Sequence, residues 1–159
     1  MATNTIDADT PISEYLSFKI SVLYRLMVRR SARFLNNTHD LSVAEWWTIG
    51  QLAVNSPSTV SELVDSTQND KAQISRSATA LISKGYVDKQ DNPKDKRSSL
   101  LSLTDAGREL YEQVIPMRQK TQNVFLEQLT EEELEVTERA IQKLTTYLLD
   151  HPELVVAAE

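Results

Sequence analysis

A chain of 159 residues, 40% of them hydrophobic, is long enough for a compact domain with a core, and three glycines and five prolines favour helices. The absence of cysteine excludes disulfides and thiolate metal sites, and no apolar run approaches the ~20 residues of a membrane helix. A net charge of −6 counts against a nucleic-acid partner, although the distribution of charge matters more than its total. We expect a cytoplasmic protein without membrane contact.

The first forty residues predict an arm and one long helix. Residues 1–10 are polar and acidic, unlike a signal peptide, and we expect a disordered arm there. The segment 12–37 has apolar residues at three- and four-residue steps, which is typical of one helix face. Residues 36–40 are expected to end this helix.

Helix starts are predicted by capping boxes, in which a Ser or Thr is followed three residues later by Glu. The boxes are Ser42 with Glu45, Thr59 with Glu62, and Thr130 with Glu133. They predict helices over about 43–54 and 60–66, and from 131 to about 149. Asp70, with a glutamine three residues on, starts a fourth helix over 71–84 in the same way.

The segment 70–107 predicts a helix followed by a basic hairpin. We expect the helix to bury its apolar face, which consists of Ile74, Ala78, Leu81 and Ile82. Gly85 then ends it, and strands over 87–89 and 99–103 flank a polar tip at 91–97 that contains a proline. A further helix runs from Asp105 past Pro116.

This order of elements predicts a mainly α fold with a small β wing, a winged helix-turn-helix over 41–104. The helices over 11–40 and 105–150 are left with apolar stripes that need a partner. The natural partner for these stripes is the same pair of helices in a second subunit. We therefore expect a homodimer with dimerisation regions at both ends of the chain.

Charge is unevenly distributed. From Gln68 to Arg97 there are seven basic and four acidic residues, whereas residues 127–159 hold nine acids and two bases. The basic segment coincides with the predicted helix and hairpin, which favours DNA binding through one face. Ordinary variation among solvated faces is the alternative.

Several motifs are spaced jointly along the chain. They are Asp95-Lys96-Arg97, Leu103-Thr104-Asp105-Ala106-Gly107, and Asp70-Lys71 ahead of Ser75-Arg76, Leu81 and Gly85. The set resembles the wing tip and recognition helix of the multiple antibiotic resistance regulator (MarR) family of bacterial transcription factors. The resemblance extends from about Tyr15 to Leu149.

The resemblance implies a homodimeric repressor, or less often an activator, on a short pseudo-palindromic operator. Recognition helices would enter successive major grooves of double-stranded DNA, and wings would reach the minor grooves. It also implies release of DNA when a small anionic aromatic compound binds between the dimerisation and DNA-binding parts. Oxidant sensing through cysteine is excluded, because the chain has none.

Nine residues are predicted to meet DNA: Lys71, Gln73, Ser75, Arg76, Thr79, Lys94, Asp95, Lys96 and Arg97. An arginine at a wing tip can enter a narrow minor groove, and Asp95 is expected to orient Arg97 or a helix-end amide. Gln73 and Arg76 can pair with adenine and guanine, whereas Ser75 and Lys71 suit phosphate. Ordinary solvated positions are the alternative for each.

A ligand site is hypothesised around Arg25, Arg29, His39, Trp46 and Trp47. Adjacent tryptophans on a helix point about 100° apart, so one should pack inside and the other should line a cavity or the dimer seam. Gly50 on that helix makes room for a close helix crossing or, less favoured, for a ligand. The expected effector is an aromatic carboxylate or its coenzyme A thioester.

No catalytic, cofactor or metal site is expected, because His39 and His151 stand in unrelated contexts and the glycines lie far apart. The rival interpretations are a helical adaptor for protein–protein contacts and a DNA binder without ligand response. An enzyme is a remote third.

Overall fold

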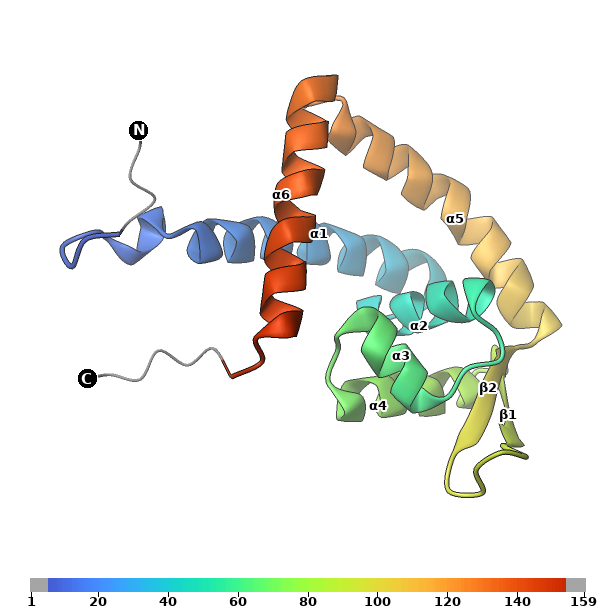
Figure 1. Cartoon of the computed structure of the whole chain (residues 1–159). Coiled ribbons are helices and arrows are strands. Elements are labelled where there is room, and N and C mark those ends of the chain that lie inside the picture. Colours follow the sequence, from blue (N-terminus) through green and yellow to red (C-terminus); the bar gives the residue numbers. More distant parts are fainter. Residues whose placement is uncertain (1–5, 154–159) are drawn as a thin grey trace. The chain divides into compact units, whose positions relative to one another are not determined.

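The computed structural model describes residues 6–153 and is mainly helical with one small wing, as predicted (Figure 1). A short 3-10 helix, Ile12–Glu14, precedes the other elements. These are α1 (Leu16–His39), α2 (Val43–Val54), α3 (Val60–Thr67), α4 (Lys71–Ser83), β1 (Val87–Asp91), β2 (Ser99–Leu103), α5 (Asp105–Leu126) and α6 (Glu131–Asp150). The chain divides into two compact units, one up to Tyr111 and one from Glu112.

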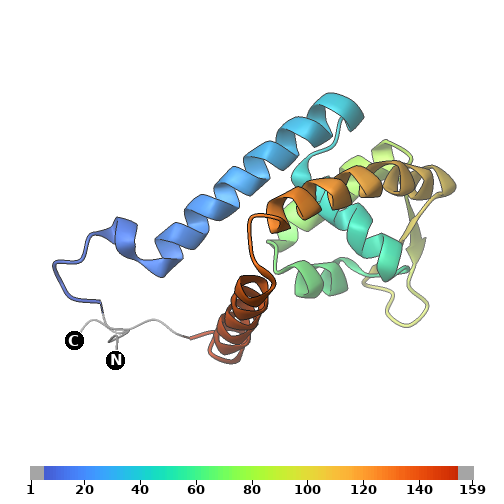
Figure 2. The ribbon, with the colours of Figure 1, turned by 90° about the horizontal axis from the view of Figure 1, so that it is seen from above.

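The long N-terminal helix differs from its prediction at both ends. Tyr15 is extended and separates the 3-10 helix from α1, while α1 runs two residues beyond the predicted segment 12–37 and ends within the range 36–40 that was expected to end it. Its end comes at Asp40, which adopts the left-handed conformation with φ 50° and ψ 42°. Figure 2 shows α1 as one uninterrupted helix that leads to the turn into α2. The asparagines at 36 and 37 therefore lie within the last turns of the helix.

The predicted arm over 1–10 is described only from residue 6, and its first five residues lie outside the described part. Within the described part, the backbone N–H of Thr10 donates to the carbonyl of Asp7 at 3.0 Å.

Capping determines where the helices of the first unit begin. Ser42 and Thr59 each accept a hydrogen bond from the backbone N–H of the glutamate three residues on, and each glutamate accepts one in return. Leu41 and Trp46 flank the first box and are both buried, as a hydrophobic staple requires. The predicted helix starts are confirmed.

A small core holds α2, α3 and α4 together beneath the wing. Its fully buried side chains include Leu41, Ile49, Leu52, Leu63, Ile74 and Leu81. Of the four apolar residues predicted to be buried on α4, Ile74, Ala78 and Leu81 are buried, but Ile82 is 36% exposed. The prediction for Ile82 was wrong because position 82 lies three residues beyond Thr79, on the polar side of the helix.

The wing is a two-stranded antiparallel sheet in which Val87 pairs with Leu103 and Asp91 with Ser99. The first strand is two residues longer than predicted. Gly85, with φ 77°, ends α4 in the left-handed conformation that glycine tolerates. The segment before α3 adds a bridge at the other edge of β2, because the backbones of Ser58 and Leu101 exchange hydrogen bonds of 3.0 and 2.8 Å.

The second unit holds the remainder of α5, including Pro116, and α6. Thr130 and Glu133 cap α6 as predicted, with bonds of 3.3 and 2.8 Å. Many apolar side chains of α6 are exposed, among them Ile141 and Leu148 at 57% and 61%. No helix between residues 6 and 153 combines the length and the apolar character that crossing a membrane requires.

Candidate nucleic-acid interface

A hollow of about 230 Å³ separates α4 from the wing and the start of α3. Three basic side chains surround it: Lys71 from α4, Lys89 from β1 and Arg97 from the end of the wing tip. Its remaining lining consists of hydroxyl groups and a few apolar side chains, namely Thr59, Val60, Ser61, Ser75, Ala78, Thr79, Ile82, Ser98, Ser99 and Leu101. We call it the cationic hollow, because its charged lining residues are all basic.

One side of α4 faces the cationic hollow because of helical spacing. Lys71, Ser75 and Thr79 recur every four residues and therefore lie above one another on the same face. The opposite side of the helix carries the buried Ile74 and Leu81, which hold α4 against the core. The helix start is capped by Asp70, whose carboxylate accepts the backbone N–H of Gln73 at 3.0 Å.

The wing tip is exposed and internally organised. The carboxylate of Asp95 accepts the backbone N–H of Arg97 at 3.0 Å, and the Nε of Arg97 lies 3.7 Å from the same oxygen. The Arg97 side chain is 96% exposed. Asp95 therefore shapes the loop that presents Arg97, which is the arrangement expected from the sequence.

An acidic side chain at the start of α3 contributes to the electrostatics beside this surface. The backbone N–H and the hydroxyl of Thr59 hold the pKa of the Glu62 carboxyl below its ordinary value, and Lys94 in the wing lowers it further. Glu62 is therefore ionised at neutral pH, and its two bonds to Thr59 fix the carboxylate at the helix start.

Four of the nine predicted DNA-contacting residues line the cationic hollow: Lys71, Ser75, Thr79 and Arg97. The other five, Gln73, Arg76, Lys94, Asp95 and Lys96, lie exposed on α4 or in the wing tip. The sequence interpretation did not include Lys89, Ser61 and Ser98, among other lining residues of the cationic hollow, in the DNA-binding surface. Lys89 had one signal, since the predicted hairpin places it beside the strand over 99–103, where it pairs with Leu101.

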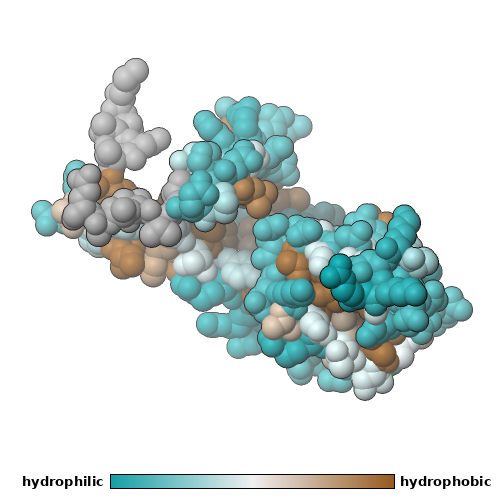
Figure 3. All heavy atoms as spheres, turned by 60° about the horizontal axis from the view of Figure 1, so that its bottom comes forward, coloured by the Kyte–Doolittle hydropathy of each residue, from teal (hydrophilic) through white to brown (hydrophobic). Residues whose placement is uncertain are grey.

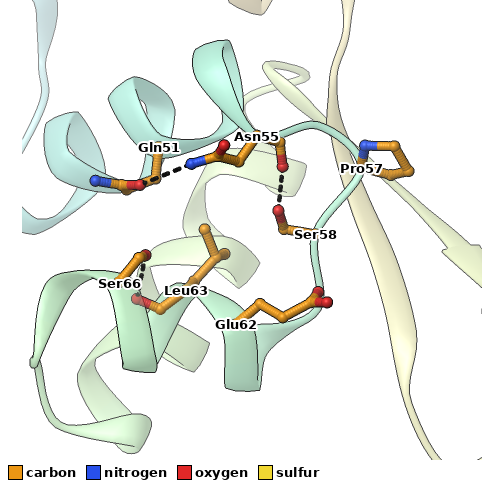
Figure 4. Close-up of a pocket in the computed structure, with 7 residues that line it drawn as sticks. All are labelled: Gln51, Asn55, Pro57, Ser58, Glu62, Leu63 and Ser66. Atoms are coloured by element: carbon orange, nitrogen blue, oxygen red, sulfur yellow. Dashed lines mark hydrogen bonds between the residues drawn. The ribbon is translucent and has the colours of Figure 1, made fainter.

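A second hollow, of about 370 Å³, lies between the end of α2 and α3 (Figure 4). Its lining residues are Gln51, Asn55, Pro57, Ser58, Glu62, Leu63 and Ser66. The only charged group among them is the Glu62 carboxylate, and the amide of Asn55 donates to that of Gln51 at 3.4 Å. This polar hollow therefore does not favour an anion, in contrast to the cationic hollow.

The residues of the hypothesised ligand site have different environments. Trp46 is buried and stacks on Tyr111, with ring centroids 5.7 Å apart, whereas Trp47 is 46% exposed, so the two tryptophans separate as expected. Arg25 and Arg29 are exposed on α1, and His39 lies at its end against Phe34. Neither hollow is lined by these residues.

Gly50 does not mark a close helix crossing. A Cβ atom at this position would meet no described atom within 4 Å, apart from its own helix backbone. The favoured explanation for this glycine was therefore wrong within the described chain. Among the residues from 6 to 153, no group of three or more His, Cys, Asp or Glu side chains is arranged to hold a metal ion.

The helix-turn-helix of α3 and α4, the wing and the basic surface between them define a winged-helix DNA-binding protein. A family model described as MarR family matches residues 39–98, which include α3, α4, β1 and the wing tip but end just before β2. An HTH-type transcriptional regulator of Staphylococcus aureus is 27% identical over 104 residues, 65% of this chain and 70% of the relative. Over its winged-helix part the chain is therefore similar to MarR-family DNA-binding transcriptional regulators.

Solved structures agree with the fold over most of the chain. A MarR/EmrR family regulator from Acinetobacter sp. ADP1 has a TM-score of 0.82 and 25% identity, covering 89% of this chain and 99% of that one. The MepR–DNA complex of S. aureus has a TM-score of 0.78 and 20% identity, covering 84% and 98%. BpsR of Bordetella bronchiseptica, whose DNA binding is regulated by 6-hydroxynicotinic acid, has 0.78 and 19%, covering 86% and 96%.

Proposed function

We propose that this protein is a homodimeric repressor that binds a pseudo-palindromic operator in the cytoplasm. The cationic hollow carries the proposal, because a strand of DNA that passes between α4 and the wing would place its phosphates against Lys71, Lys89 and Arg97. Gln73 and Arg76 on α4 would then read bases in the major groove. Arg97 would reach the adjacent minor groove, with Lys94 and Lys96 beside the phosphates.

The terminal helices would form the dimer. Exposed apolar side chains on α1, including Leu16, Ile20 and Leu23, are 47–59% exposed in the single chain. Figure 3 shows hydrophobic side chains gathered near the start of α1, whereas the visible face of the winged-helix part is largely hydrophilic. We assign dimerisation to residues 11–40 and 105–150 and DNA binding to 41–104, because monomers rarely leave such surfaces in water.

We propose further that a small anionic aromatic compound, or its coenzyme A thioester, releases the DNA. The regulation of BpsR by 6-hydroxynicotinic acid supports this class of effector, given the shared fold. The half-exposed Trp47 and the cations Arg25 and Arg29 would supply an aromatic surface and positive charge, with His39 and Trp46 close in the chain.

A binding titration tests the DNA-binding part of the proposal. The operator is first selected from random duplex, and affinity is then measured by fluorescence anisotropy across a range of salt concentrations. We expect log affinity to fall linearly with log salt. Lys89→Met should reduce the slope by about 0.9, because one phosphate is then no longer neutralised by the protein. A protein–protein adaptor would instead show negligible affinity for duplex at every salt concentration.

Effector release needs a separate measurement. Aromatic carboxylates and their thioesters are titrated into the protein–operator complex, and tryptophan fluorescence and DNA anisotropy are followed together. A compound that quenches fluorescence and lowers anisotropy supports the effector proposal. A broad set of such compounds with neither response would favour a regulator without ligand response.

A further inference from the structure

The residue at the end of α4 is hydrogen-bonded to a part of the chain that is distant in sequence. Lys84 follows α4, and its ammonium group donates to the backbone carbonyl of Asp40, which is 44 residues away. The same group donates to Oε1 of Glu45 at 2.8 Å and lies 3.6 Å from the carboxylate of Asp40. These contacts bring together the end of α1, the start of α2 and the end of α4. We call the three residues the junction cluster.

Glu45 has two functions in this cluster. One carboxylate oxygen, Oε2, accepts the backbone N–H of Ser42 at 2.6 Å and completes the capping box of α2. The other, Oε1, accepts from Lys84. A capping box needs only the first contact, as Glu133 illustrates at the start of α6. The bond to Lys84 therefore requires an explanation beyond capping.

The ion pair between Lys84 and Glu45 is partly buried and is therefore not an ordinary surface contact. The Glu45 side chain is 8% exposed and that of Lys84 28%. Burial raises the pKa of the Glu45 carboxyl, but hydrogen bonds from Lys84 and Ser42 outweigh it, so its pKa lies below its ordinary value. Both groups are therefore charged at neutral pH. Such an ion pair adds little net stability, but loss of the Lys84 amine would leave the buried Glu45 carboxylate without its cation, which is unfavourable.

The packing between α2 and α4 does not depend on Lys84. Ile49 and Leu52 on α2, and Ile74 and Leu81 on α4, are fully buried and form the apolar contact of the winged-helix core. Loss of the Lys84 amine would leave this core intact. What it would remove is the link from α4 to Asp40, the left-handed residue at which α1 turns into α2.

We propose that Lys84 is a positioning residue for DNA reading, which holds the end of α4 at a fixed place relative to α1 and thereby sets the half-site spacing that the dimer accepts. The inference rests on the proposed homodimer, in which α1 belongs to the interface. Two reading helices must meet the duplex about 10 base pairs apart, so a change in the angle between α1 and α4 alters their separation.

The test measures spacing tolerance rather than affinity alone. Full-length protein is titrated against the selected operator and against versions whose half-sites are one base pair closer or further apart. Wild-type protein, Lys84→Met, Lys84→Arg and Glu45→Gln are compared well below their melting temperatures, with the dimer verified by sedimentation. Glu133→Gln is the matched control, since Glu133 makes the same capping contacts and none with a lysine is described.

We expect Lys84→Met to reduce discrimination against the shifted operators by about tenfold, equivalent to about 1.4 kcal/mol. Lys84→Arg should retain the discrimination, and Glu45→Gln should share the loss. The double variant should be no worse than either single one, because both remove the same interaction. Glu133→Gln should leave the spacing profile unchanged.

Two results would separate failure of the inference from failure of the proposed function. A Lys84→Met dimer that binds the operator with the wild-type spacing profile would overturn the positioning role and leave the DNA-binding function standing. Wild-type protein that binds no duplex would overturn both.

Discussion

The Arg97 side chain is almost fully exposed on the basic surface. Its guanidinium is nearly free of contacts with other side chains except Asp95, whose carboxylate fixes the backbone from which Arg97 projects. Because the backbone of the tip is already fixed, entry into a groove costs only the rotamer freedom of the Arg97 side chain, and a narrow minor groove concentrates negative potential. The geometry of the tip therefore favours insertion of Arg97.

The first prediction follows from this geometry. Arg97→Ala should weaken operator binding by at least about tenfold and leave the dimer folded, since the residue contributes nothing to the core. Anisotropy titration measures the affinity, and circular dichroism the fold. Arg108→Ala removes an equal charge from an exposed position outside the wing and should change the affinity much less. Equal effects of the two variants would argue against a special contribution of the wing.

The second prediction concerns Glu45 and acid stability. Folding lowers the pKa of the Glu45 carboxyl, so the ionised carboxylate stabilises the folded state. This contribution is fully present at pH values above the ordinary pKa of the carboxyl, and it is lost as the pH falls through the folded-state pKa. Glu45→Gln cannot titrate and should show a flatter loss of stability on the acid side. Urea unfolding midpoints measured from neutral pH downwards test this. Parallel curves for the two proteins would contradict it.

At the scale of elements, two glycines on helices have opposite surroundings. A Cβ at Gly107, in the first turn of α5, would lie 2.1 Å from the carbonyl oxygen of Tyr86, and this backbone atom cannot move away cheaply. Gly50, inside α2, would meet no described atom within 4 Å. The same substitution should therefore have opposite effects at the two positions.

The third prediction states these effects. Gly107→Ala should destabilise the protein by about 1–3 kcal/mol, because the clash separates α5 from the start of the wing. Gly50→Ala should stabilise it by about 1 kcal/mol, because alanine loses less conformational entropy in a helix. Denaturant midpoints at constant slope give both values. Equal shifts in the same direction would contradict the described packing.

How far the sequence predicts an element depends on how local its determinants are. The starts of α2, α3 and α6 were predicted correctly, because a capping box is closed by side chains and backbone only three residues apart. The end of α1 was predicted only to within residues 36–40, because its exact place depends on the left-handed Asp40 and on contact with Lys84, 44 residues further on.

In the candidate site, likewise, residues grouped by local spacing were predictable, whereas those grouped by tertiary packing were not. Lys71, Ser75 and Thr79 share a face by helical spacing alone, so their grouping could be predicted. Ser61 joins them only through the packing of α3 beside α4 and the wing, which no local pattern encodes, whereas the predicted hairpin gave one signal for Lys89. The role of Asp95 in the tip was predictable, because its partner is two residues away.

At the scale of the whole molecule, the exposed apolar surface of the terminal helices is the proposed dimer interface. Ile141 and Leu148 are more than half exposed on α6, and neither is fully buried in the single chain. Charges introduced there should leave the subunit folded but prevent association. Val54, 75% exposed at the end of α2, offers an apolar position outside these helices for comparison.

The fourth prediction is that Ile141→Lys combined with Leu148→Lys converts the protein into folded monomers in sedimentation. Operator affinity should fall by about a hundredfold or more, because the second half-site no longer binds in the same molecule. Val54→Lys should remain dimeric. A dimer that survives the double substitution would place the interface elsewhere.

The bridge between Ser58 and Leu101 has a consequence for protein engineering. Because this contact and the pairing of Val87 with Leu103 hold the strands of the hairpin in place, the frame of the wing is set by residues outside 92–98. We therefore expect that the loop over residues 92–98 can be replaced without loss of the wing. Loops of other lengths and charges could be grafted onto it, so that minor-groove preference is redesigned while the scaffold is retained.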